Sequence, residues 1–122
     1  MLKHYIPYRS RAFRDVEFRK LVIIINFEIE EVTLKTTNGK VVGFSQWTID
    51  KKKRSMHIHD FEITPKYRGK GYGSFLARVI IDIARLYHIK HMTLVDGATL
   101  EGFWQHLGFG SREWSSNLVL KL

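Results

Sequence analysis

The chain has 122 residues, with 20 lysines and arginines against 12 aspartates and glutamates, which gives a formal charge of +8. It contains no cysteine, which excludes disulfide bonds, a thiol nucleophile and a cysteine-ligated zinc site. No apolar run approaches the ~20 residues that cross a bilayer, and the first residues lack the apolar stretch of a signal peptide. We therefore expect one domain over residues 1–122, located in the cytoplasm and without a membrane partner.

A short strand over residues 2–6 and a helix over residues 12–20 are the first expected elements. The β-branched run over residues 21–25 is typical of a buried strand or the end of a helix, and Phe27 and Ile29 continue an alternating pattern. The alternation changes phase at residues 30 and 31. We therefore expect a bulge or a turn at that point.

An antiparallel meander is expected next. Asn38-Gly39 lies between two alternating segments, residues 32–36 and 41–49, which is typical of a two-residue hairpin. Residues 50–54 are polar and predict a turn into a further strand over residues 56–63.

From residue 72 the apolar pattern takes the period of a helix, and we expect about four or five turns. Its apolar stripe consists of Phe75, Leu76, Val79, Ile80, Ile83, Leu86 and Tyr87. A strand over residues 91–95 follows the helix. A strand–helix–strand crossover implies that this strand pairs in parallel with residues 56–63.

The end of the chain predicts a short helix and one or two strands. Thr99 can cap the helix, Trp104 lies on its apolar side, and Gly108 ends it. Residues 112–122 supply the last strands. The whole order predicts an α/β fold with a mixed, mostly antiparallel central sheet flanked by helices.

A basic, glycine-rich turn joins the strand over residues 56–63 to the long helix, and it reads Arg68-Gly69-Lys70-Gly71-Tyr72-Gly73. Such a backbone can converge several N–H groups, and the helix that follows adds unpaired donors and a positive dipole. A polyphosphate ligand is therefore expected. A dinucleotide motif would need glycine at Ser74 or Leu76, and a P-loop would need it at Thr64, so neither motif is present.

The turn matches the pattern R-x-x-G-x-G if its first glycine, Gly69, is assigned to a position where any residue is allowed. It is followed by Phe103-Trp104-Gln105-His106-Leu107-Gly108-Phe109. These two motifs, in this order after a strand, resemble the GNAT superfamily of acyl-CoA-dependent N-acyltransferases. The resemblance covers residues 56–110 and implies a GNAT-like fold with acetyl-CoA as the cofactor.

The resemblance also implies which residues bind acetyl-CoA. The backbone of the turn would hold the pyrophosphate, with Arg68 shaping the turn, and the main chain of Phe61, Glu62 and Ile63 would pair with the pantetheine arm like an added strand. The turn residues are Arg68, Gly69, Lys70, Gly71, Tyr72, Gly73 and Ser74.

Trp104 is the remaining residue that the resemblance implies at the cofactor. Many family members have a tyrosine here that can protonate the departing thiolate, whereas an indole N–H is no useful acid. Tyr67, Tyr72 or a water would then supply that proton. The alternative is that Trp104 is a core aromatic of its helix.

His57 and His59 are the candidate catalytic bases, since residues two apart on a strand share a face and histidine titrates near neutrality. The H-x-H pattern is similar to that of arylalkylamine (serotonin) N-acetyltransferases. They could also be strand histidines with ordinary hydrogen bonds. Glu62 is an alternative base if a bulge turns it, and no metal site is expected because Asp60 and Glu62 point to the opposite face.

The expected function is transfer of an acetyl group from acetyl-CoA to a primary amine of a small molecule or an exposed peptide. Family members usually have a strand and two helices before the meander, and this chain has about twenty residues there. The shortened N-terminal region predicts an open acceptor groove or one completed in a homodimer.

Two alternative functions remain open. Trp104 and Gly97, which stands where the family often has asparagine, would also suit a CoA-binding module with little or no turnover. Charge alone would allow a nucleic-acid-binding domain, but no aromatic residues interleave the basic run over residues 51–54, so no nucleic-acid partner is expected.

Overall fold

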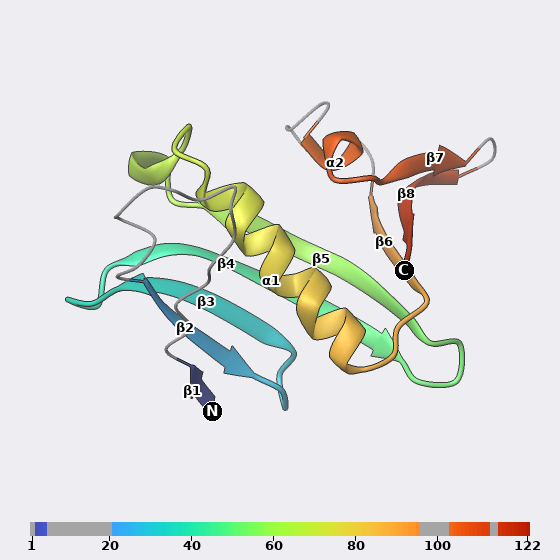
Figure 1. Ribbon diagram of the computed structural model, residues 1–122, viewed down its shortest axis with the longest axis horizontal. Coiled ribbons are helices and arrows are strands. Elements are labelled where there is room, and N and C mark those ends of the chain that lie inside the picture. The colour runs from blue at the N-terminus through green and yellow to red at the C-terminus, as the bar shows by residue number, and fades with distance from the viewer. Residues whose placement is uncertain (1, 5–20, 96–102, 113–114) are drawn as a thin grey trace. The chain divides into compact units, whose positions relative to one another are not determined.

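The computed structural model describes residues 2–4, 21–95, 103–112 and 115–122 (Figure 1). The helix expected over residues 12–20, the cap at Thr99 and Gly97 lie outside the described residues. The strands are β1 (Leu2–His4), β2 (Leu21–Asn26), β3 (Glu31–Thr36), β4 (Val41–Asp50), β5 (Ser55–Ile63), β6 (His91–Val95), β7 (Gly110–Arg112) and β8 (Ser115–Lys121). The helices are the short 3-10 helix η2 (Pro65–Tyr67), α1 (Tyr72–Leu86) and α2 (Phe103–His106).

The chain divides into two compact units. The first contains residues 1–46 and 60–80, and the second contains residues 47–59 and 81–122. β4, β5 and α1 therefore continue from one unit into the other. The expectation of a single domain stays a prediction.

In the first unit the strand order is β1-β2-β3-β4-β5, and the first three pairings are antiparallel (Figure 1). Alternate residues of β2 are buried and lie opposite buried residues of β3, as in the pair Ile23 and Leu34. The predicted strand is confirmed, but it ends at Asn26 and does not reach Ile29. The Asn26 carboxamide oxygen accepts the N–H groups of Glu28 and Ile29 at 3.0 and 3.3 Å, which turns the chain and leaves Ile29 60% exposed.

The β3–β4 connection is a hairpin, but not the two-residue turn that Asn38-Gly39 predicts. Gly39 has a φ of 89° and donates its N–H to Thr36 O at 3.0 Å, while Asn38 does not have a positive φ. A two-residue type I′ turn needs positive φ at both central residues. The connection is therefore the longer form, a type I turn followed by a left-handed glycine.

In the second unit the strand order is β4-β5-β6-β8-β7 (Figure 1). β5 and β6 pair in parallel, as predicted, from Ser55 opposite His91 to Ile58 opposite Leu94. β8 pairs antiparallel with β6 and with β7, which confirms the expected last strands. The core face of this unit includes the buried Met56, Ile58, Met92, Leu94 and Leu118.

The apolar stripe of α1 is buried from Phe75 to Ile83, as predicted, but Leu86 and Tyr87 are 67% and 37% exposed. The helix end explains this difference. Ile89 donates its N–H to Ala84 O at 2.9 Å, and His88, with a φ of 56°, donates to Arg85 O at 3.0 Å. This is a Schellman motif, and its apolar residue is the buried Ile89 rather than Leu86 or Tyr87.

The architecture is a mixed, mostly antiparallel sheet with flanking helices, as the sequence predicts. Among the described residues, no helix combines the length and apolar character needed to cross a membrane.

Candidate functional site

The glycine-rich turn follows the end of β5. Thr64 donates its N–H to Val42 O at 2.9 Å, and the 3-10 helix η2 then brings Arg68 back toward the strand. The Arg68 Nε–H donates to Ile63 O at 2.9 Å, so this arginine shapes the turn. Gly69 and Gly71 have φ of 75° and 91°, a region that disfavours residues with a Cβ.

The donors of this turn suit an anion. Arg68 and Lys70 are exposed, and the first turn of α1 contains no acidic residue. The first backbone hydrogen bond of α1 runs from Phe75 N–H to Gly71 O at 3.1 Å, so the amides before Phe75 have no acceptor within the helix. In the described part of the chain, nothing lies within 4 Å of a Cβ added at Gly69, which leaves open space at that position. The donor set therefore fits a pyrophosphate group.

β5 extends beyond its pairing with β6. Within the described residues, the register between these strands ends at Ile58 opposite Leu94, while β5 continues to Ile63. Phe61 and Ile63 are half-buried and Glu62 is exposed. Where a strand extends past the end of its neighbour, an extended ligand can pair with its main chain.

His57 and His59 lie on one face of β5, as predicted, with ring centroids 4.9 Å apart. Each ring shares a hydrogen bond with a threonine hydroxyl on a neighbouring strand. His57 Nδ1 lies 2.7 Å from Thr93 Oγ1 on β6, and His59 Nε2 lies 2.5 Å from Thr48 Oγ1 on β4. His57 is half-buried and His59 is exposed, so the pair is held by its hydrogen bonds and remains accessible.

Burial lowers the pKa of His57 from its usual value of 6.5, and the neighbouring His59 lowers it further by charge repulsion. The neutral imidazole is therefore favoured near neutral pH. A neutral imidazole is the form that can accept a proton.

The carboxylates of β5 lie on the opposite face of the strand from the two histidines. Asp60 and Glu62 alternate with His57 and His59 along the continuous strand, and both are exposed. Among the described residues, no group of three or more His, Cys, Asp or Glu side chains is placed to hold a metal ion. Glu62 as an alternative base would require a local change in the strand.

Trp104 lies in α2 and is 4% exposed. Its ring makes edge contacts with Phe103 and Phe109 at centroid distances of 5.0 and 5.3 Å. These contacts favour the interpretation of Trp104 as a core aromatic. Its contact with the cofactor stays a prediction.

Thr93 and Thr48 are the residues of this site that sequence reasoning missed. Alternation along β5 predicted the shared face of the two histidines, but threonines are common in strands and neither carries a motif. Only the strand register places Thr93 opposite His57. The parallel pairing was predicted without its register, so no signal in the sequence could have found the contact.

A model of the acetyltransferase (GNAT) family matches residues 2–109. An uncharacterised N-acetyltransferase of Methanocaldococcus jannaschii is 32% identical over 84 residues, which are 62% of this chain and 37% of the relative. The chain thus matches little more than a third of that relative's length.

Solved structures show the same fold. N-acetylglutamate synthase from Neisseria gonorrhoeae, complexed with coenzyme A and L-arginine, has a TM-score of 0.67 at 22% identity, over 76% of this chain and 24% of that one. An acetyltransferase from Bacillus cereus has a TM-score of 0.67 at 20% identity, over 81% of both chains. With the family model covering most of its length, the chain belongs to the GNAT acetyltransferase family.

Proposed function

We propose that this protein transfers an acetyl group from acetyl-CoA to a primary amine of a small molecule or an exposed peptide. The observation that carries the proposal is the basic turn over residues 68–71, with its two left-handed glycines, directly before a helix without acid in its first turn. Family membership supports the same cofactor, because the gonococcal relative was solved with coenzyme A. A cytoplasmic location and a homodimer stay predictions.

Acetyl-CoA would be held by two stretches of this chain. The backbone amides of residues 69–74, with Lys70, bind the pyrophosphate, and Arg68 keeps the turn in shape through its bond to Ile63 O. The main chain of Phe61, Glu62 and Ile63 pairs with the pantetheine arm. When bound, acetyl-CoA supplies an acetyl group activated as a thioester.

The histidines handle the proton that the amine loses. His57 is the base in this proposal, because its lowered pKa keeps the ring neutral and able to accept a proton. For Nε2 to accept a proton, Nδ1 must carry one, and Thr93 Oγ1 then accepts the Nδ1–H. The exposed His59 passes the proton to solvent. Trp104 has no hydroxyl that can protonate the departing thiolate. The hydroxyls of Tyr67 and Tyr72 can do so instead, and the two rings lie beside the turn with centroids 5.8 Å apart.

Acetyl-CoA is expected to stabilise the protein in a saturable way. At a free concentration about 100-fold above its Kd, acetyl-CoA should add about 2.7 kcal/mol to the free energy of unfolding, because it binds the folded chain and not the unfolded one. Thermal unfolding at increasing acetyl-CoA measures this effect. Release of free thiol on adding an amine panel then measures transfer.

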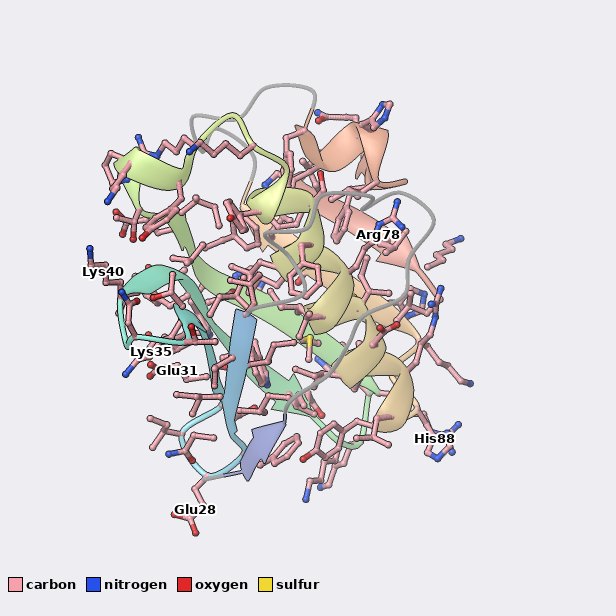
Figure 2. The ribbon with its side chains drawn as sticks, turned by 60° about the vertical axis from the view of Figure 1, so that its left-hand side comes forward. Glu28, Glu31, Lys35, Lys40, Arg78 and His88 are labelled. Atoms are coloured by element: carbon pink, nitrogen blue, oxygen red, sulfur yellow. The ribbon has the colours of Figure 1, made fainter. Side chains whose placement is uncertain are left out.

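Lys70→Ala should weaken acetyl-CoA binding about fivefold, since an exposed charge contributes up to about 1 kcal/mol. Lys40→Ala is the matched control, because Lys40 extends from the β3–β4 connection away from the strands (Figure 2). If acetyl-CoA at millimolar concentration stabilised neither the parent nor the control, the proposed function would be rejected.

Replacing Thr93 with valine should lower kcat/KM about three- to tenfold, because one hydrogen bond contributes about 0.5–1.5 kcal/mol. Thr93→Ser keeps the hydroxyl and should retain most activity. Nitrogen NMR of the imidazoles gives a second measurement, because Thr93→Val should change the balance of His57 tautomers and Thr93→Ser should not. Equal activity and equal tautomer populations in both variants would rule out the positioning role.

A CoA-binding module with little turnover is the second candidate. It is favoured by Trp104, which is buried against Phe103 and Phe109 and provides no acid. Such a module would be stabilised by acetyl-CoA but would release no more thiol with an amine than without one.

A further inference from the structure

A basic surface lies at one end of the second unit, and we call it the basic end. It consists of the exposed Lys51, Lys52, Lys53, Arg54, Lys90 and Lys121. Three segments bring these residues together. Arg54 O accepts the N–H of Lys90 at 2.7 Å, Leu122 donates its N–H to Lys90 O at 2.9 Å, and Lys121 is the register partner of His91.

Among the described residues of the second unit, acidic side chains do not neutralise the basic end. The described residues of the second unit include eight lysines and arginines but two acidic residues, Asp50 and Asp82. Asp82 lies 3.7 Å from Arg85, and Asp50 accepts the backbone N–H groups of Lys52 and Lys53 at 3.0 and 3.1 Å. Asp50 thereby orders the turn and leaves the lysine side chains to solvent. The basic end therefore suits an anionic partner.

A polar strand face leads from this surface to the histidines. On β5, Ser55, His57 and His59 alternate on one side, and their register partners on β6 are His91 for Ser55 and Thr93 for His57. All five residues are half-buried or exposed. From Arg54 to His59 the strand advances about 17 Å, at about 3.3 Å per residue. An extended peptide covers that length in about five residues.

We propose that the acceptor amine belongs to a polypeptide whose acidic residues, about five positions from that amine, contact the basic end. The inference rests on the proposed acetyl transfer to an amine. A polypeptide offers an aliphatic amine and carboxylates in one molecule. A nucleic acid offers phosphates but no aliphatic amine, which is why the polypeptide is favoured.

The kinetic test compares synthetic peptides with a free α-amine that differ only at the fifth and sixth positions, which hold Glu, Gln or Lys. The Glu peptide is expected to have kcat/KM about tenfold above the Gln peptide, through KM. K52E/K53E should remove that advantage and leave the Gln peptide unchanged, and added salt should reduce it. Lys40→Glu also reverses a lysine charge, but in the first unit. It should change kcat/KM for neither the Glu nor the Gln peptide.

A binding test separates this inference from the proposed function. With labelled, non-acetylated peptides and no acetyl-CoA, the Glu peptide should bind the parent more tightly than K52E/K53E by about tenfold. Acetylation of all three peptides at equal kcat/KM would overturn the inference and leave the proposed function standing. If no amine were acetylated, equal binding of the Glu and Gln peptides would still overturn it. Tighter binding of a mixed-sequence oligonucleotide that displaces the Glu peptide would identify nucleic acid as the partner instead.

Discussion

Replacing His57 with glutamine is expected to lower kcat/KM by about 10²-fold or more, because general base catalysis contributes about 10²–10⁴-fold. Glutamine keeps a polar group that can bond Thr93 but cannot accept the proton of the amine. Thiol release at saturating acetyl-CoA, with the amine varied, measures the effect. The Kd of acetyl-CoA should stay the same.

The pH dependence of kcat/KM should identify the base. The pKa of His57 is lowered first by burial and then by His59, so activity should persist below pH 6.5 before it falls. His59→Gln removes the second cause and should move the acid limb of the profile to higher pH, with burial still acting. Besides His59, the residues of this face on the neighbouring strands include Thr48 and, by alternation, Asp50 on β4, and Thr93 and the histidine His91 on β6.

The same lowered pKa affects stability. Between the folded pKa of His57 and 6.5, the unfolded chain binds more protons than the folded one. The stability contributed by the neutral ring is therefore present above this window and is lost as the pH falls through it. His57→Gln should flatten this part of the stability–pH curve.

His88→Asn is the control for the histidine substitutions. His88 is exposed beyond the end of α1 and has a left-handed backbone that asparagine tolerates (Figure 2). It should leave the pH profile of kcat/KM unchanged. A profile that is also unchanged in both His57→Gln and His59→Gln would show that neither histidine is the base.

Gly43→Ala is expected to lower the free energy of unfolding by about 1–3 kcal/mol through overpacking. A Cβ at Gly43 would lie 2.6 Å from Ile63 Cδ1 and 2.8 Å from Glu62 O. The Ile63 side chain can rotate, but the carbonyl oxygen belongs to the backbone of β5. Because this backbone is proposed to pair with the pantetheine arm, the variant should also bind acetyl-CoA more weakly. Denaturant unfolding and thermal titration with acetyl-CoA measure the two effects.

Gly110→Ala is the matched control, because a Cβ there would meet no described residue within 4 Å and the φ of Gly110 is not positive. It should leave both the free energy of unfolding and the acetyl-CoA affinity close to those of the parent. Equal stability of the Gly43 and Gly110 variants would mean that β4 and β5 separate easily at Ile63.

The elements that were predicted correctly have a strong local pattern. The alternation of β2, the helical stripe from Phe75 to Ile83 and the glycine turn at residues 68–71 each follow from neighbouring residues. Besides the turn type at Asn38-Gly39, the errors concern the ends of β2 and α1, where local hydrogen bonds ended the element. Asn26 ended β2, and the Schellman bonds of His88 and Ile89 ended α1 at Leu86, which is exposed.

The sequence by itself determined the fold class, the basic glycine-rich turn at residues 68–71 and the shared face of His57 and His59, because periodicity and glycine conformation are properties of short segments. Only the tertiary structure decided that Thr93 bonds His57, that Gly43 packs against the backbone of Glu62, and that Lys90 and Lys121 lie with residues 51–54 in the basic end. Those contacts depend on strand register between segments far apart in the chain, and the residues on either side do not encode it locally.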